Sequence, residues 1–230
     1  MSGPVIAIRP EPGCSATAAH GPQMGLAIEA WPLFEVGPLA WEPPLAERID
    51  ALLLGSANAV RCAGAGLDAF RGKPAYAVGA VTAASAEAAG LTVVATGRGG
   101  LQPLLETVRP PRTLLRLAGE EHIALRPPLG VVIDTRIVYR SAARPMPEPL
   151  AARLRGGGLV LLHSGAAAWH FAAECDRLDV PRAAIALAAL GPRIADAAGE
   201  GWRALQSAGE PREAALLALA RDMCHDSPRG

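Results

Sequence analysis

The segment Ala51–Arg61 reads ALLLGSANAVR: an apolar run, a short turn at Gly55–Asn58 and a second apolar run at helical spacing. This pattern predicts a buried strand, a tight turn and the start of a helix. The segment Leu159–Phe171, LVLLHSGAAAWHF, repeats the same pattern later in the chain. Two copies of one strand–turn–helix unit predict two similar α/β lobes.

Each copy is followed by a second strand that breaks at a glycine and enters an alanine-rich helix. The first break is at Gly79, with Thr82 in the next turn, and the second is at Gly191, before Pro192 and Arg193. Strands that alternate with helices are typical of parallel sheets with crossover helices. The predicted fold class is therefore α/β, with two similar doubly wound parallel-sheet lobes.

Two extended segments, residues 35–41 and 131–142, are predicted to join the lobes as a two-stranded connector. The first lies in a proline-rich stretch and the second is long for one strand. Because the chain leaves the first lobe and returns to it, that lobe is predicted to be discontinuous. Lobe 1 comprises 1–34 and 143–230, and lobe 2 comprises 42–130.

Two local elements follow from capping and composition. Ser15 can cap a helix over roughly Ala16–Met24, because serine is favoured at helix N-caps. In lobe 2, the strand Thr113–Leu117 is expected to lead into a short helix near Glu120–Leu125.

The charge and composition exclude several classes of protein. The chain of 230 residues has 22 basic and 22 acidic residues, which argues against nucleic-acid binding through a general positive field. No apolar run approaches the roughly 20 residues of a membrane span. The four cysteines are widely spaced, and no secretory leader is evident, so we expect reduced thiols and a cytoplasmic location. No membrane partner is predicted.

No metal or organic cofactor is predicted. The run Gly64–Ala69 fits a dinucleotide-binding pattern, but it follows a predicted helix where the motif requires a strand. His163 and His170 lack cysteine or carboxylate partners at metal-ligand spacing. Lys73, the only lysine, sits in a loop between Gly and Pro, which argues against Schiff-base catalysis.

The turns after the strands are candidate anion sites. Backbone N–H groups at helix starts lack helical partners and attract anions, and ligands of doubly wound sheets bind at this edge. Ser56 and Ser164 occupy such positions, although for their hydroxyls we favour the simpler interpretation, a plain N-cap. Neither serine lies in a G-x-S-x-G motif, so a hydrolase is not supported. Tyr139 is either a strand tyrosine that covers a lobe junction or a phenol that donates a proton.

In their order and spacing, Ser56–Val60, Ala77–Gly79, Val138–Arg140 and Gly191–Pro192 resemble the motifs of uroporphyrinogen-III synthases, over nearly the whole chain. The resemblance implies two α/β lobes with a two-stranded connector. It also implies a lyase that removes water from hydroxymethylbilane, inverts its last pyrrole ring and closes the macrocycle through a spiro intermediate, without a cofactor. By analogy, Tyr139 assists departure of the hydroxyl.

The substrate that this resemblance implies is a flexible polyanion, so we expect helix starts and arginines to bind its carboxylates. We expect a monomer. The predicted substrate-binding residues, which are helix-start positions or nearby cations, are Arg9, Ser56, Ala57, Asn58, Gly79, Thr82, Arg140, Ser164, Gly165, Pro192 and Arg193.

Three positions depart from the family pattern. Ile194 stands where Thr or Ser is frequent, Ala118 where Arg is common, and His163 where an aromatic residue is usual. The alternatives left open are therefore a non-catalytic two-lobe protein that binds tetrapyrroles or other polyanions, and an unrelated two-lobe α/β sensor domain.

Overall fold

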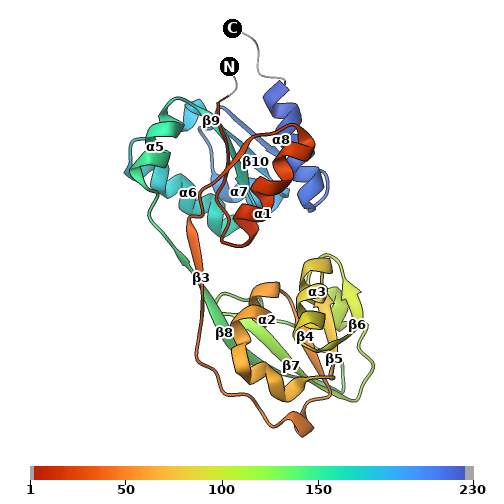
Figure 1. Cartoon of the computed structure of the whole chain (residues 1–230). Coiled ribbons are helices and arrows are strands. Elements are labelled where there is room, and N and C mark those ends of the chain that lie inside the picture. The colour runs from red at the N-terminus through yellow and green to blue at the C-terminus, as the bar shows by residue number, and fades with distance from the viewer. Residues whose placement is uncertain (1–2, 226–230) are drawn as a thin grey trace. The chain divides into compact units, whose positions relative to one another are not determined.

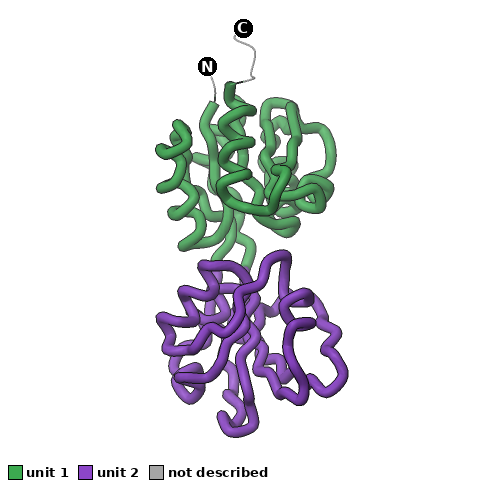
Figure 2. Tube along the Cα trace, turned by 90° about the vertical axis from the view of Figure 1, so that its right-hand side faces the viewer, with its two compact units in different colours: residues 1–35, 142–230 green, residues 36–141 purple. Residues whose placement is uncertain are grey.

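The structure, a computed structural model, describes residues 3–225. The chain divides into two compact units, residues 1–35 with 142–230 (unit 1) and residues 36–141 (unit 2), coloured separately in Figure 2. The chain leaves unit 1 within β3 (Phe34–Pro38) and returns within β8 (Val131–Ala143), and these two strands are neighbours in one sheet. The expectation of an α/β fold with parallel sheets is confirmed.

The sheet of unit 1 has five parallel strands in the order β2-β1-β9-β10-β11. Two of its central strands, β9 and β10, are labelled in Figure 1. The sequence runs outward in both directions from the β1/β9 pair, which makes this pair the topological switch point. The three central strands, β1 (Val5–Ala7), β9 (Gly158–Leu162) and β10 (Ile185–Ala189), are buried and consist of small and branched apolar residues. The edge strands β2 (Ile28–Ala30) and β11 (Ala204–Ser207) are partly exposed and include polar residues.

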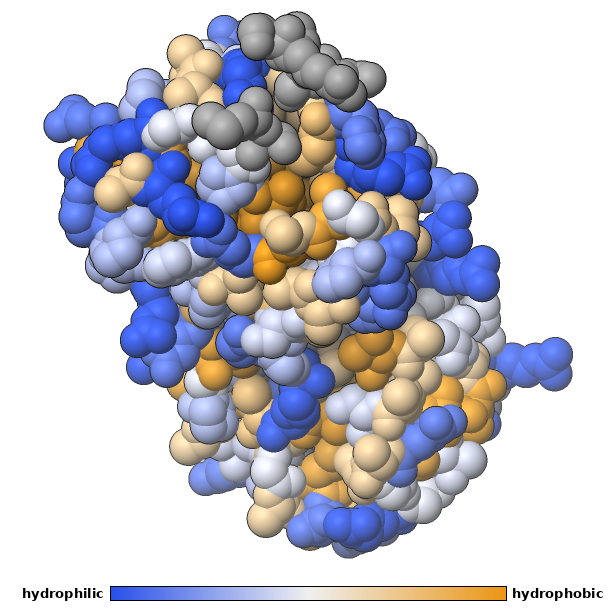
Figure 3. Space-filling model, turned by 45° about the horizontal axis from the view of Figure 1, so that its top comes forward, coloured by the Kyte–Doolittle hydropathy of each residue, from blue (hydrophilic) through white to orange (hydrophobic). Residues whose placement is uncertain are grey.

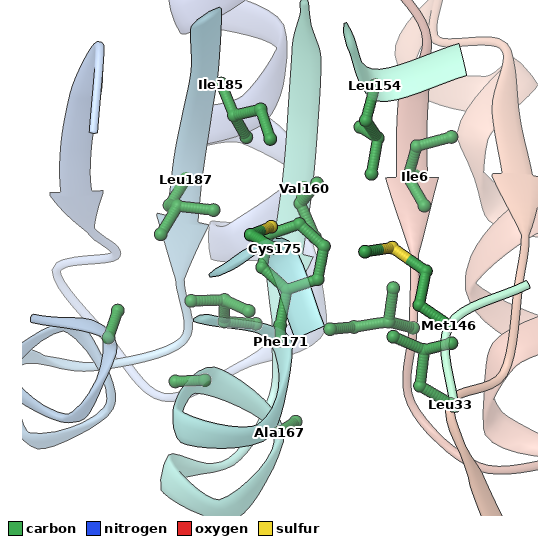
Figure 4. Close-up of a cluster of buried hydrophobic side chains, with 14 of the residues drawn as sticks. Ile6, Leu33, Met146, Leu154, Val160, Ala167, Phe171, Cys175, Ile185 and Leu187 are labelled. Atoms are coloured by element: carbon green, nitrogen blue, oxygen red, sulfur yellow. The ribbon is translucent and has the colours of Figure 1, made fainter. Parts of the chain in front are cut away.

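Helices cover both faces of the unit 1 sheet. On one face, Phe171, Leu150 and Ala198 join side chains of β1, β9 and β10 in a single buried cluster (Figure 4). On the other face, Cys14, Leu216 and Ala220 pack against alternate residues of the same strands. The helices are α5 (Glu148–Arg155), α6 (Gly165–Arg177) and α7 (Pro192–Ala198) on the first face, and α1 (Gly13–His20) and α8 (Glu213–His225) on the second.

The sheet of unit 2 has six strands in the order β3-β8-β7-β4-β5-β6, and the pairs from β8 to β6 are parallel. Its switch point lies between β4 and β7. The remaining strands are β4 (Ala51–Leu54), β5 (Pro74–Val78), β6 (Thr92–Gly97) and β7 (Arg112–Gly119). One face is covered by α2 (Ala57–Ala63), the 3₁₀ segment Gly64–Phe70 and α3 (Ala80–Ala88), and the other by α4 (Leu101–Leu105).

Two predicted helices differ from the structure. The first helix begins at Gly13, and Ser15 lies inside it, where its hydroxyl donates to the Glu11 carboxylate (2.8 Å) and does not cap. The expected helix near Glu120–Leu125 is wrong. The connection from β7 to β8 is an irregular coil, although these neighbouring strands are parallel and such crossovers usually contain a helix.

The surface is mixed in polarity. On the face drawn in Figure 3, hydrophilic residues are interspersed with hydrophobic ones. Two of the most exposed large apolar side chains, Ile123 and Leu129, belong to the coil between β7 and β8. No helix within residues 3–225 combines the length and apolar character needed to cross a membrane.

Candidate functional site

The switch point of unit 2 brings two turns together at the carboxyl ends of adjacent strands. β4 ends before Gly55 and Ser56, and its parallel neighbour β7 ends at Gly119. This edge is where ligands of doubly wound sheets bind, because the strand order reverses there and leaves a crevice.

Ser56 is the N-cap of α2, as the simpler of the two sequence interpretations predicted. Its backbone is extended, and its hydroxyl accepts a hydrogen bond from the N–H of Asn58 (3.2 Å). The Asn58 side chain accepts from Arg61 (2.6 Å), and Ala57 is buried at the helix start. Ser56 itself is half-buried and lines the pocket beside the switch point.

Tyr139 lies near the carboxyl end of β8, and its ring packs on the backbone of Gly119. A methyl group built on Gly119 would lie 2.7 Å from Cζ of Tyr139, so only glycine permits this approach. The neighbouring Val138 is fully buried, whereas Tyr139 is half-buried. Within residues 3–225 the Tyr139 hydroxyl has no hydrogen-bond partner, and it lines the same pocket as Ser56.

The pocket has a volume of about 710 Å³ and lies beside the β7–β8 connection, which is a coil. One side is α4 and the other is the coil after β7. Gln102 of α4 fixes the coil, donating to the carbonyl of Arg126 (3.0 Å) and accepting from its N–H (2.9 Å). His122 Nδ1 lies 2.9 Å from the Gly119 carbonyl at the start of the coil. Hydrogen bonds therefore hold the coil that forms one side of this partly open pocket.

Arg116 was missed by the sequence predictions. It lies in β7, two residues before Ala118, and only 6% of its surface is exposed. Burial lowers the pKa of its guanidinium, but an arginine keeps its charge at neutral pH. The sequence signal was a single charged residue in an otherwise apolar strand, Leu114–Ala118.

The start of α3 holds two more predicted residues. Gly79 has φ of +79°, a conformation that favours glycine, and its N–H donates to the Gly97 carbonyl (3.0 Å). Thr82 is 5% exposed, so its side chain offers little surface to a ligand. Neither residue lines the pocket that contains Tyr139.

In unit 1, the switch point brings Arg9 and His163 to one carboxylate. Glu213, in the first turn of α8, is contacted by Arg9 (3.1 Å), by His163 Nε2 (3.1 Å) and by the Thr17 hydroxyl (2.5 Å). Burial alone would raise the pKa of Glu213. The hydrogen bonds from His163 and Thr17 and the positive charges lower it to about 2. Arg9 is thus engaged with a fixed carboxylate.

Ser164 is the N-cap of α6, and its hydroxyl accepts from the N–H of Ala167 (3.2 Å). Gly165 follows it in the first helical turn. Pro192 occupies the first turn of α7, and Pro192 and Arg193 are exposed.

In unit 2, Arg140 is exposed beside Tyr139.

The chain is an α/β protein with parallel sheets and a pocket at the carboxyl edge of the unit 2 sheet, the place where proteins of this class usually bind small molecules. Among residues 3–225, no group of three or more His, Cys, Asp or Glu residues could hold a metal ion. Residues 15–218 match the family model described as uroporphyrinogen-III synthase HemD, and the chain belongs to that family. Its activity is that of a uroporphyrinogen-III synthase, a lyase of heme biosynthesis, and the non-catalytic alternative is not favoured.

Solved structures of the same family share the fold. The uroporphyrinogen-III synthetase of Helicobacter pylori is 16% identical, with a TM-score of 0.63, over 96% of this chain and 99% of that one. A mutant uroporphyrinogen III synthase from Thermus thermophilus is 16% identical, with a TM-score of 0.52, over 97% and 100%. No curated protein matches the chain.

Proposed function

We propose that this uroporphyrinogen-III synthase binds hydroxymethylbilane at the carboxyl edge of the unit 2 sheet and that Tyr139 is its proton donor. One observation carries the proposal. The half-buried Tyr139 ring packs on Gly119 and lines a pocket of about 710 Å³, and its hydroxyl has no partner among residues 3–225. An uncommitted phenol in a partly enclosed pocket is suited to general acid catalysis.

In the proposed first step, the phenol gives its proton to the terminal hydroxyl of the substrate as the C–O bond breaks. Water leaves, and the pyrrole nitrogen stabilises the electron-poor carbon that remains. The substituted carbon of the last ring attacks this carbon and gives a spiro intermediate. The original bond from the substituted carbon to the bridge with the third ring then breaks. The freed bridging carbon bonds to the unsubstituted carbon of the last ring, which closes the macrocycle with that ring inverted. The proton released on closure returns to the phenolate. Free hydroxymethylbilane closes without inversion, so the protein must favour attack at the substituted carbon.

The carboxylate arms of the substrate require several anion-binding groups. We propose that the helix starts at Ser56–Asn58, Gly79–Thr82, Ser164–Gly165 and Pro192–Arg193 contribute N–H groups, since unpaired N–H groups at helix starts attract anions. The N–H groups of Asn58 and Gly79 are not among them, because they donate to the Ser56 hydroxyl and the Gly97 carbonyl, and Pro192 has none. Arg140 is exposed beside Tyr139 and is a stronger candidate than Arg9, whose guanidinium pairs with Glu213 (3.1 Å).

We also infer that the enzyme acts as a cytoplasmic monomer and that its two units are similar lobes joined by residues 35–41 and 131–142. Reduced cysteines support the location. Cys14 and Cys175 are buried and free, and burial raises the pKa of each thiol to about 12. Light scattering during gel filtration tests the monomer, and a dimer mass would contradict it.

Gly119→Ala tests the position of the Tyr139 ring. The added methyl group would lie 2.7 Å from Cζ of Tyr139, so the ring must move. We expect kcat to fall by up to roughly a hundredfold, the cost of misplacing a reacting group by about 1 Å. Steady-state kinetics measure the effect.

The matched control is Gly37→Ala, because an added methyl group at Gly37 meets no atom within 4 Å. This variant should keep the wild-type kcat. A Gly119→Ala enzyme as active as Gly37→Ala would mean that the ring position is irrelevant to turnover.

A further inference from the structure

The pocket contains a buried cation that has no part in the steps proposed above. Arg116 is 6% exposed, and its side chain lies on the face of the unit 2 sheet that α4 and the β7–β8 coil cover. Its Nη2 donates to the carbonyl of Ile123 (2.9 Å), while Nε is buried with no partner. Of the five N–H groups that a guanidinium carries, at least one therefore lacks an acceptor.

Buried charges in proteins are normally paired, because an isolated ion loses its hydration without compensation. The other buried charged side chain, Glu174, follows this rule among the described residues. It pairs with Arg177 (2.6 Å) and accepts the N–H of Met146 (2.5 Å). Arg116 has no ion-pair partner within residues 3–225. The structure therefore contains a buried cation that lacks its anion.

The carboxylates that line this pocket do not neutralise the Arg116 charge. Glu106 and Glu121 line the same pocket, but neither comes within ion-pair distance of Arg116. The Glu106 side chain accepts from Gln102 (3.1 Å) and Glu121 is exposed. The pocket lining as a whole is mostly apolar, with Leu101, Leu117 and Leu125 among its residues. An occupant with an apolar body and a carboxylate would match both features.

We propose that Arg116 binds a carboxylate of the substrate inside this pocket, so that the pocket receives a pyrrole ring together with its acidic side chain. This assignment rests on the proposed function and specifies which group recognises the substrate. Arginine suits the role because its planar fork matches a carboxylate in two parallel hydrogen bonds. Since the guanidinium is held by the Ile123 carbonyl before the ligand arrives, little side-chain entropy is lost on binding.

The test compares Arg116→Met with Arg71→Met in binding and in kinetics. Arg71 lies in the same unit, is exposed and pairs with Asp68 (2.8 Å), so its loss changes the net charge equally outside the pocket. The binding probe is uroporphyrin, a stable tetrapyrrole octacarboxylate, followed by its fluorescence. We expect Arg116→Met to weaken uroporphyrin binding and raise the KM for hydroxymethylbilane by about ten- to a hundredfold. Arg71→Met should alter neither, and kcat should change much less than KM.

Arg116→Gln separates binding from support of the coil. Glutamine keeps a donor for the Ile123 carbonyl but has no charge, so it should bind uroporphyrin as weakly as methionine, whereas Arg116→Lys should recover part of the affinity. Arg116→Gln also replaces Arg116→Met in the test if the methionine variant does not fold. Wild-type affinity in Arg116→Gln, or an equal loss in Arg71→Met, would overturn the proposal. If the wild type does not turn over hydroxymethylbilane, the proposed function fails, yet the uroporphyrin titrations still decide the role of Arg116.

Discussion

Tyr139→Phe is expected to lower kcat for hydroxymethylbilane by about 10²–10⁴-fold, the usual contribution of a general acid. The substitution removes only the hydroxyl, which has no hydrogen-bond partner within residues 3–225, so no other contact is lost. The ring stays to pack on Gly119 and on the buried cluster of unit 2. The free energy of unfolding should therefore change little. Single-turnover kinetics, with the loss of substrate followed directly, give the rate of the chemical step.

Tyr76→Phe is the matched control, because Tyr76 is the only other tyrosine and does not line the pocket. It should keep the wild-type rate. If Tyr139→Phe turns over substrate as fast as Tyr76→Phe, Tyr139 is not the proton donor.

Phe171→Ala is expected to lower the free energy of unfolding by about 3–5 kcal/mol, because truncating a buried aromatic side chain leaves a cavity. Phe171 lies in α6, is fully buried and stacks on Trp202 with ring centroids 5.7 Å apart. Figure 4 shows it among side chains of β1, β9 and β10, where it attaches α6 to the sheet. Its loss should therefore weaken the support of the turn at Ser164. Urea unfolding followed by circular dichroism measures the change.

Trp169→Ala serves as the control for Phe171→Ala, because Trp169 lies in the same helix but is 69% exposed. It should cost well under about 1 kcal/mol, as surface substitutions usually do. Equal destabilisation by the two substitutions would contradict the assignment of Phe171 to the core of unit 1.

The sequence was sufficient to predict the strands and their turns because their signals are local. The runs Ala51–Leu54 and Leu159–Leu162 are apolar, strand-length and bounded by turn residues, and each is followed by a serine that caps a helix. The coil after β7 could not be predicted in the same way. Residues 120–125 have helix-forming composition, but the segment is too short to nucleate a helix alone. The Gln102 side chain, distant in sequence, binds both the carbonyl and the N–H of Arg126, which directly follows this segment, so these two groups are not available to a helix.

The site was only partly predictable from the sequence, because some of its features depend on contacts between residues that are distant in sequence. Ser56 and Tyr139 were identified from motifs, and the structure brings both to one pocket. Arg9 was expected to be available for an anion, but its partner Glu213 lies 204 positions away in sequence, and nothing local indicates that pair. Arg116 was overlooked because its importance comes from burial without a counter-ion. That burial involves the coil after β7, whose Ile123 carbonyl contacts the guanidinium and which the sequence predicted as a helix.

Separation of the uroporphyrinogen isomers formed from fresh hydroxymethylbilane tests the central claim most directly. We expect the purified protein to accelerate the loss of substrate and to give the isomer with the inverted last ring. Formation of the uninverted isomer alone, at the rate seen without protein, would contradict it.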